Sequence, residues 1–243
     1  GLTGGVLAAV PLSNPAHAEA DPWDEARAIR ARIRPPSFPR ANRFTPQQFG
    51  GVPDGVTDCT RAFTRAVEAA SHAQGGGRVV AEGGVFLTGP IHLKSNVELH
   101  VDREATIRFK TDEAAYYPPV LTRYEGTEFM GVSPLIYAYD CENVAVTGHG
   151  VLDGQAGVDN WWRNKRVADG QESDNGRLRR WAEEGRPVAR RVFGPGSTIR
   201  PQFIQPYRCR NVLISDVTII RPRGSTPEAS KPEGTTIISG LNL

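Results

Sequence analysis

The 243-residue sequence has little of what marks several common protein classes. Its three cysteines, Cys59, Cys141 and Cys209, lie far apart and match no metal-binding spacing. An odd number permits at most one internal disulfide, and the spacing does not choose the pair. The net charge of +2 argues against a dedicated nucleic-acid binder, whose basic face would show in the total.

A membrane-spanning run is also missing. Residues 1–18 are small and apolar, but the stretch is too short to cross a bilayer. It ends in Ala16-His17-Ala18, which has the small-x-small form of a signal-peptidase site. The basic start of such a signal is absent, so we expect a partial export signal and an exported protein, periplasmic or extracellular. A disordered Ala-rich tail is the alternative.

One short phrase occurs three times, as Ser95–Leu99, Glu142–Val146 and Arg210–Ile214. Each copy places an Asn before apolar residues that fall two apart and therefore share one face of a β-strand. Asn tolerates the left-handed backbone region, so the phrase predicts a bend followed by a short inward-facing strand. Such units cannot bury an apolar face alone, whereas stacked units can, which favours a β-solenoid. A β-sandwich is the alternative, but sandwiches lack a repeated bend phrase.

The segments before the first phrase predict a linker and a cap. Residues 19–43 mix Arg, Pro and acidic residues, as linkers do. The Gly-rich turn 49–55 then precedes a helix, with Thr57 or Asp58 as its N-cap. Its apolar side carries Phe63, Ala66, Val67 and Ala70. We expect this helix to cover the first edge of the solenoid.

Six stretches follow, in order, the pattern of one known family. They are Phe49–Gly55, Leu87–Val97, Thr122–Gly126, Ser133–Ala138, Thr147–Gln155 and Arg200–Ile204. Over roughly residues 44–221 the chain resembles the N-terminal part of glycoside hydrolase family 28, the polygalacturonases. The resemblance implies an all-β, right-handed parallel β-helix with an N-terminal capping helix. It also implies inverting hydrolysis of α-1,4-galacturonosyl linkages in pectin or polygalacturonate, with neither a metal nor a cofactor.

The family's catalytic signatures are not found here. They are Asn-x-Asp, Asp-Asp, Gly-His-Gly and Arg-x-Lys, and the sequence has no Asp-Asp pair and no Arg-x-Lys after the third phrase. Gly148-His149-Gly150 spells one signature, but its neighbours belong to an earlier structural motif, so His149 is not assigned. We therefore expect no catalytic residue in this chain, which we predict to be inactive alone. The substrate-binding residues stay unknown.

The last stretch departs from the family. Residues 222–243 form a divergent tail without another Asn bend. We expect a solenoid truncated after its early coils, by an early end or a shifted reading frame near Arg221. Nucleotide sequence downstream that encodes no paired aspartates in any frame would contradict a frameshift.

Several other residues are candidates with a simpler structural explanation. Asp153 lies in a Gly-bounded turn, where a carboxylate that bonds its own backbone is commoner than a general acid. Three isolated acids, Asp140, Asp159 and Asp216, carry no role by sequence alone. Trp161-Trp162 beside Arg163 and Lys165 predicts either a stacking platform for a sugar acid or the anchor of a loop. His92 and His100 alternate with apolar neighbours, which puts them on the outer strand face, and without carboxylate partners we expect no metal site there.

Two other functions stay open. A polysaccharide lyase would use the same solenoid with Ca²⁺ and a basic residue, but a carboxylate cluster for the metal is not apparent. A non-catalytic carbohydrate-binding solenoid would need only aromatic and basic surface.

Overall fold

The computed structural model describes residues 21–157, 160, 173–222, 236–238 and 241–242. It divides into two units, residues 1–34 and 35–243. In the first unit the stretch predicted as a linker contains helix α1 (Pro22–Arg32), which Asp21 caps by accepting a hydrogen bond from the Trp23 amide at 3.0 Å. None of the helices in the described part of the chain has the length and apolar character needed to cross a bilayer.

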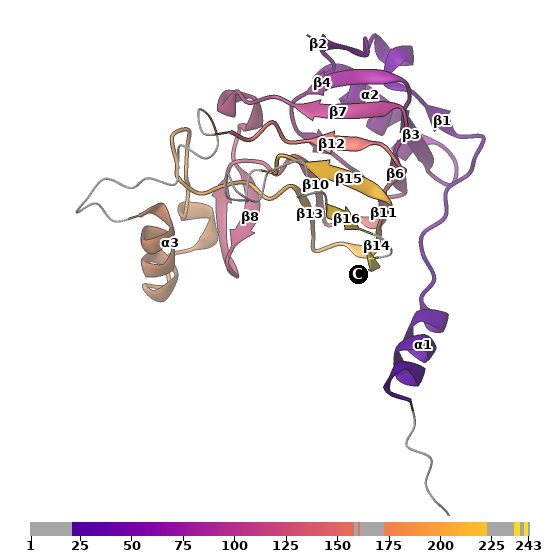
Figure 1. The fold of residues 1–243 in the computed structure, drawn as a ribbon. Coiled ribbons are helices and arrows are strands. Elements are labelled where there is room, and N and C mark those ends of the chain that lie inside the picture. Colours follow the sequence, from indigo (N-terminus) through magenta and orange to yellow (C-terminus); the bar gives the residue numbers. More distant parts are fainter. Residues whose placement is uncertain (1–20, 158–159, 161–172, 223–235, 239–240, 243) are drawn as a thin grey trace, which may run out of the picture. The chain divides into compact units, whose positions relative to one another are not determined.

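The second unit is built from three stacked sheets, whose strands follow one another around each coil (Figure 1). Sheet A contains β1 (Arg43–Phe44), β3 (Gly77–Ala81), β6 (Val97–Val101), β11 (Glu142–Thr147), β14 (Arg210–Ser215) and β17 (Leu241–Asn242). Sheet B contains β2 (Asp54–Asp58), β4 (Gly84–Thr88), β7 (Ala105–Phe109), β12 (Val151–Asp153), β15 (Val217–Ile220) and β16 (Thr236–Ile238). Sheet C contains β5 (Ile91–His92), β10 (Ile136–Tyr139) and β13 (Ile204–Tyr207).

Each coil visits sheets A, B and C in turn, and equivalent strands pair in parallel. Thus Val97 pairs with Val144, and Val144 with Val212, on successive rungs of sheet A. Among the described strands, β16 and β17 are the two that pair antiparallel to the strands of sheets A and B. The fold is a right-handed parallel β-helix, as the sequence predicts.

The apolar core lies inside the coils. The alternating residues that share the inner face, such as Val97, Leu99 and Val101 of β6, are fully buried. Sheet B contributes Phe86, Ile107 and Leu152 to this core, and sheet C contributes Ile136. Because each rung buries its inner face against the next, short strands share one continuous core.

The three Asn bends have the predicted conformation. Asn96, Asn143 and Asn211 have φ values of 62°, 53° and 55°, in the left-handed region. Their side chains also form a ladder: Asn211 Nδ2 donates to Asn143 Oδ1 at 2.7 Å, and Asn143 Nδ2 to Asn96 Oδ1 at 2.9 Å. The Asn residues therefore have two roles: their backbone turns the chain, and their side-chain amides hold neighbouring rungs in register.

Helix α2 (Thr60–His72) covers the first end of the stack (Figure 1). The predicted apolar side is buried, with Phe63 packed edge-to-face on Phe86 at 5.7 Å. The predicted N-cap is wrong, because Cys59 occupies that position. Asp58 nevertheless contributes, since its carboxylate accepts a hydrogen bond from the Thr60 amide at 3.0 Å. The short helix η1 (Pro46–Phe49) packs beside α2.

Two long insertions leave sheet B and return to sheet C. The first, residues 110–135, contains η2 (Glu113–Tyr116) and the hairpin of β8 (Val120–Tyr124) and β9 (Thr127–Gly131). The second, residues 154–203, contains α3 (Asp174–Glu183) and η4 (Val188–Arg190). The two pack together through a second apolar cluster of Phe129, Leu178, Phe193 and Ile199.

All three cysteines are free thiols. Cys59 is buried beside α2, whereas Cys141 and Cys209 occupy equivalent corners before β11 and β14. Both of these thiols bond backbone carbonyls, with Cys141 Sγ 3.2 Å from Tyr139 O and Cys209 Sγ 3.4 Å from Ala138 O. Rung stacking therefore places Cys141 and Cys209 at equivalent positions of neighbouring coils, with both thiols free.

Candidate functional site

The outer surface of sheet C gathers aromatic and polar side chains from three rungs. The residues alternate with the inward-facing Ile91, Ile136 and Ile204, so they point away from the core. They are His92, Tyr137, Tyr139, Gln205 and Tyr207. We call this surface, with the side chains of the β8–β9 hairpin beside it, the sheet C face.

The aromatic rings form a continuous row. His92 meets Tyr137 edge-on at 5.3 Å, Tyr137 stacks on Tyr139 at 6.4 Å, and Tyr139 lies 6.1 Å from Tyr207. Tyr137 is buried and its hydroxyl donates to the Leu121 carbonyl. Tyr139 is 38% exposed, so its ring offers a flat apolar surface to a ligand.

The first insertion is fixed to this row by hydrogen bonds. Thr122 Oγ1 donates to Gln205 Oε1 at 2.6 Å, and both residues are buried. Ser133 Oγ lies 2.9 Å from His92 Nε2. Figure 1 shows β8 and α3 together beside the stack, on the side of β10 and β13. The insertions therefore flank the sheet C face.

The face also carries charge. Arg123 and Arg208 lie over the Tyr207 ring, 5.8 Å and 5.7 Å from its centroid. Glu128 accepts hydrogen bonds from the Tyr207 hydroxyl and from Arg208, which lower the pKa of this carboxyl despite some desolvation. Arg123 is exposed and has no ion-pair partner among the described residues. The face can therefore attract an anionic ligand.

Three of the acids considered from sequence lie within the described residues and do not come together. Asp140 lies at the corner from sheet C to sheet A, Asp216 at the corner from A to B, and Asp153 at the end of β12 in sheet B. Asp153 is buried; its carboxylate pairs with Arg221 and accepts the Gln155 amide at 3.0 Å. That is a turn carboxylate, as the sequence favours. Asp159 lies outside the described residues.

The remaining sequence candidates are placed as follows. His149 is exposed at a corner of the coil, where a Cβ on Gly148 or Gly150 would meet the backbone of the previous coil at 2.1 Å or 2.3 Å. The glycines of this signature therefore serve close stacking. His100 lies on the outer side of sheet A, 2.8 Å from Thr147 Oγ1 and 3.2 Å from Asp102 Oδ1.

The other predicted platform, Trp161-Trp162 with Arg163 and Lys165, falls outside the described residues. No group of three or more His, Cys, Asp or Glu side chains within the described ranges is arranged to hold a metal ion. The tyrosines of the sheet C face were not predicted from the sequence. The alternation of Ile136 and Ala138 with Tyr137 and Tyr139 was the available signal, because it predicts two outward rings.

The β-helix thus presents a row of aromatic rings and two arginines on the outer surface of one sheet. No family model matches the sequence. The chain is 28% identical over 214 residues to a probable polygalacturonase of Vitis vinifera, covering 81% of this chain and 41% of that protein. It is 27% identical to the exo-poly-α-D-galacturonosidase of Dickeya chrysanthemi, over 72% of this chain and 32% of that protein.

The solved structures that the chain resembles include exopolygalacturonases as well. The hyperthermoactive exopolygalacturonase of Thermotoga maritima is 49% identical, with a TM-score of 0.75 over 81% of this chain and 45% of that one. The family 28 exopolygalacturonase of Yersinia enterocolitica, 18% identical with a TM-score of 0.52, shares the fold. The chain is thus similar to glycoside hydrolase family 28 and is a polygalacturonase-like protein. It spans less than half the length of these relatives.

Proposed function

We propose that the chain is part of a polygalacturonase-type glycoside hydrolase, which cleaves α-1,4-galacturonosyl linkages in pectin or polygalacturonate by inversion. The observation that carries the proposal is the 49% identity to the Thermotoga maritima exopolygalacturonase across 81% of the chain. The sheet C face supports it independently, because the exposed ring of Tyr139 and the guanidinium of Arg123, which has no ion-pair partner among the described residues, suit a chain of sugar acids.

The proposed binding mode follows from the chemistry of the face. The ring of Tyr139 packs against the apolar face of a sugar, as aromatic side chains commonly do. Arg123 pairs with the carboxylate of a uronide, a charge-assisted contact that a neutral sugar does not make. The polymer then lies along the row of rungs, which repeats about every 4.8 Å.

The hydrolytic step needs two carboxyl groups at a suitable separation, and we identify no such pair on the sheet C face among the described residues. Inversion needs an acid and a base, with carboxyl groups about 6.5–9.5 Å apart to admit a water. Glu128 is the carboxyl group of the sheet C face, and its lowered pKa makes it a poor general acid. We therefore propose that this chain contributes uronide binding and has little hydrolytic activity by itself.

The activity test compares two products from polygalacturonate. Hydrolysis releases reducing ends alone, whereas a lyase also yields unsaturated ends that absorb ultraviolet light. The proposal expects binding with few reducing ends and no ultraviolet product. Vigorous hydrolysis would contradict the predicted inactivity, and ultraviolet product would identify a lyase. The absence of both products and of binding would refute the proposal.

Binding by the sheet C face is tested with two variants and a matched control. Tyr139→Ala and Arg123→Ala should each weaken binding of polygalacturonate about fivefold to tenfold in calorimetry, since one removes a stacking surface and the other a cation. Arg103→Ala removes an equally exposed arginine at a turn outside the face and should change nothing. Equal loss in all three would indicate nonspecific attraction to a polyanion.

We also propose export, with residues 1–18 as part of the signal, 19–43 as a linker and 44–221 as the glycosidase β-helix. The Ala16-His17-Ala18 sequence supports the first assignment, and the coils from β1 onward support the last. Expression in an exporting bacterial host should yield protein that begins at Glu19. An N-terminus at Gly1 in the exported fraction would contradict the cleavage site.

A further inference from the structure

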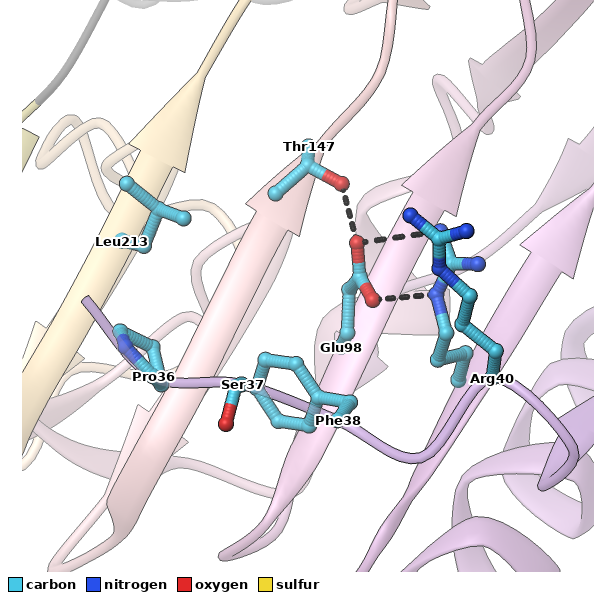
Figure 2. Close-up of a pocket in the computed structure, with 8 residues that line it drawn as sticks. Pro36, Ser37, Phe38, Arg40, Glu98, Thr147 and Leu213 are labelled. Carbon is cyan, nitrogen blue, oxygen red and sulfur yellow. Dashed lines mark hydrogen bonds and ion pairs between the residues drawn. The ribbon is translucent and has the colours of Figure 1, made fainter.

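A groove lies on the outer surface of sheet A, away from the sheet C face. It is formed where an extended segment, residues 35–41, crosses the strands of sheet A. Its volume is about 380 Å³, and its floor includes Arg78, Glu98, Thr147 and Leu213 from four successive rungs. Figure 2 shows the segment passing in front of these strands, with Pro36 toward Leu213 and Arg40 toward Glu98. We call it the strap groove.

The floor of the strap groove is a fixed charged network. Glu98 is 8% exposed and accepts hydrogen bonds from Arg78 and from the Thr147 hydroxyl (Figure 2). Burial alone would raise the pKa of this carboxyl, but bonds from His100, Arg78 and Thr147 lower it to about 2. Glu98 is therefore ionised and neutralises one arginine. Arg78 has five N–H groups and uses two of them on Glu98.

The roof adds a second cation and an aromatic ring. Arg40 lines the groove, is exposed, and has no ion-pair or hydrogen-bond partner among the described residues. Phe38 lines the same space and is half-buried. Pro35, Pro36 and Pro39 restrict the backbone around them, so the roof is preorganised in an extended form. Two guanidiniums and one carboxylate give the groove a net positive charge.

We propose that the strap groove is a second binding site, for a single hexuronic acid unit such as galacturonate. Its volume falls at the lower end of small-molecule sites, which suits one or two sugar rings rather than a long polymer. Arg40 pairs with the sugar carboxylate, the spare N–H groups of Arg78 bond its oxygens, and Phe38 packs on the ring. The choice of a uronide over other small anions rests on the proposed function.

The test measures how strongly the protein prefers galacturonate over galactose, which differ in the carboxylate. Isothermal titration of the whole chain with each sugar should give a preference of about tenfold for the acid. In Arg40→Ala and Arg40→Gln the preference should fall nearly to unity while galactose affinity stays the same. Because Arg40 is exposed and unpaired among the described residues, neither change should disturb folding, which circular dichroism checks.

Two controls separate this site from others. Arg65→Ala removes an exposed arginine of α2 and should leave the preference intact. Arg123→Ala removes one cation of the sheet C face and reports whether galacturonate binds there. If Arg123→Ala abolishes the preference and Arg40→Ala does not, the acid binds at the sheet C face and the inference is wrong. No galacturonate binding by the unaltered chain would also overturn it, whereas polygalacturonate binding and product release test the proposed function separately.

Discussion

Glu98 illustrates how stacking changes the chemistry of one side chain. In the sequence it is a glutamate within a strand, on the outward side of β6. In the coil it lies beside Arg78 of the previous rung, and Thr147 of the next coil donates to it. The folded protein therefore holds this carboxyl ionised, with a pKa near 2 against an ordinary value of 4.5.

This pKa predicts an acid-dependent loss of stability. The folded pKa lies below the unfolded one, so the contribution is complete above about pH 4.5 and disappears as the pH falls through about 2. It amounts to about 3 kcal/mol. In urea titrations, the unaltered chain should lose that much more unfolding free energy than Glu98→Gln between pH 6 and pH 2.

A matched exposed acid provides the control. Glu104 lies in the turn between β6 and β7 and is exposed, so Glu104→Gln should follow the unaltered chain at every pH. If Glu98→Gln shows the same acid dependence as the unaltered chain, the network does not stabilise the ionised carboxylate. At pH 7 the Glu98→Gln variant should be the least stable of the three, because Arg78 then lacks its partner.

At the scale of elements, the Asn at each repeated bend has two structural roles. Each Asn adopts a left-handed backbone conformation, and its amide bonds the equivalent Asn of the neighbouring rung. The first role was visible in the sequence, because Asn is one of the few residues that tolerates positive φ. The second depends on the parallel register, which brings residues 47 and 68 positions apart within hydrogen-bond distance.

Asn143 is the middle member of the ladder, so its replacement separates these roles. Asn143→Ala loses two amide hydrogen bonds and places a Cβ residue at a φ of 53°. We expect it to lower the unfolding free energy by about 2 kcal/mol or more. Asn143→Gly loses the same hydrogen bonds but accommodates the bend, so it should cost about 1 kcal/mol less in chemical denaturation. Equal stability of the two variants would show that the backbone conformation contributes nothing.

At the scale of the whole molecule, the coils enclose one apolar core. An inward-facing residue therefore packs against the equivalent residues of the rungs on either side of it. Leu99 is fully buried and stands in register with Val79 on one side and Val146 on the other. Leu99→Ala should therefore destabilise the protein by about 3 kcal/mol through lost burial and a residual cavity. The measurement is the midpoint of chemical unfolding followed by circular dichroism.

Val192 provides the contrast outside the coils. It is 48% exposed in the second insertion, so Val192→Ala should change the unfolding free energy by less than about 0.5 kcal/mol. A comparable loss in both variants would contradict the difference in burial between Leu99 and Val192. A negligible loss for Leu99→Ala would mean that the rungs do not share their packing.

Much of the fold followed from the sequence, and little of the candidate site did. The alternation around Val97, Val144 and Val212 predicted inner faces, and α2 was predicted by its apolar side. The N-cap at Cys59 was missed because Thr57 and Asp58 are both better capping residues. The sheet C face was missed because its side chains come from three strands far apart in sequence, which only rung stacking brings side by side, and from a hairpin in the first insertion.

The sequence by itself determined where the chain bends and which side chains point inward, because both depend on neighbours within a few residues. Only the tertiary structure decided which outward side chains meet. Arg123 reaches Tyr207 across 84 positions, and Glu98 reaches Thr147 across 49. Such contacts depend on the register of whole rungs and on the packing of the insertions, which no local pattern specifies.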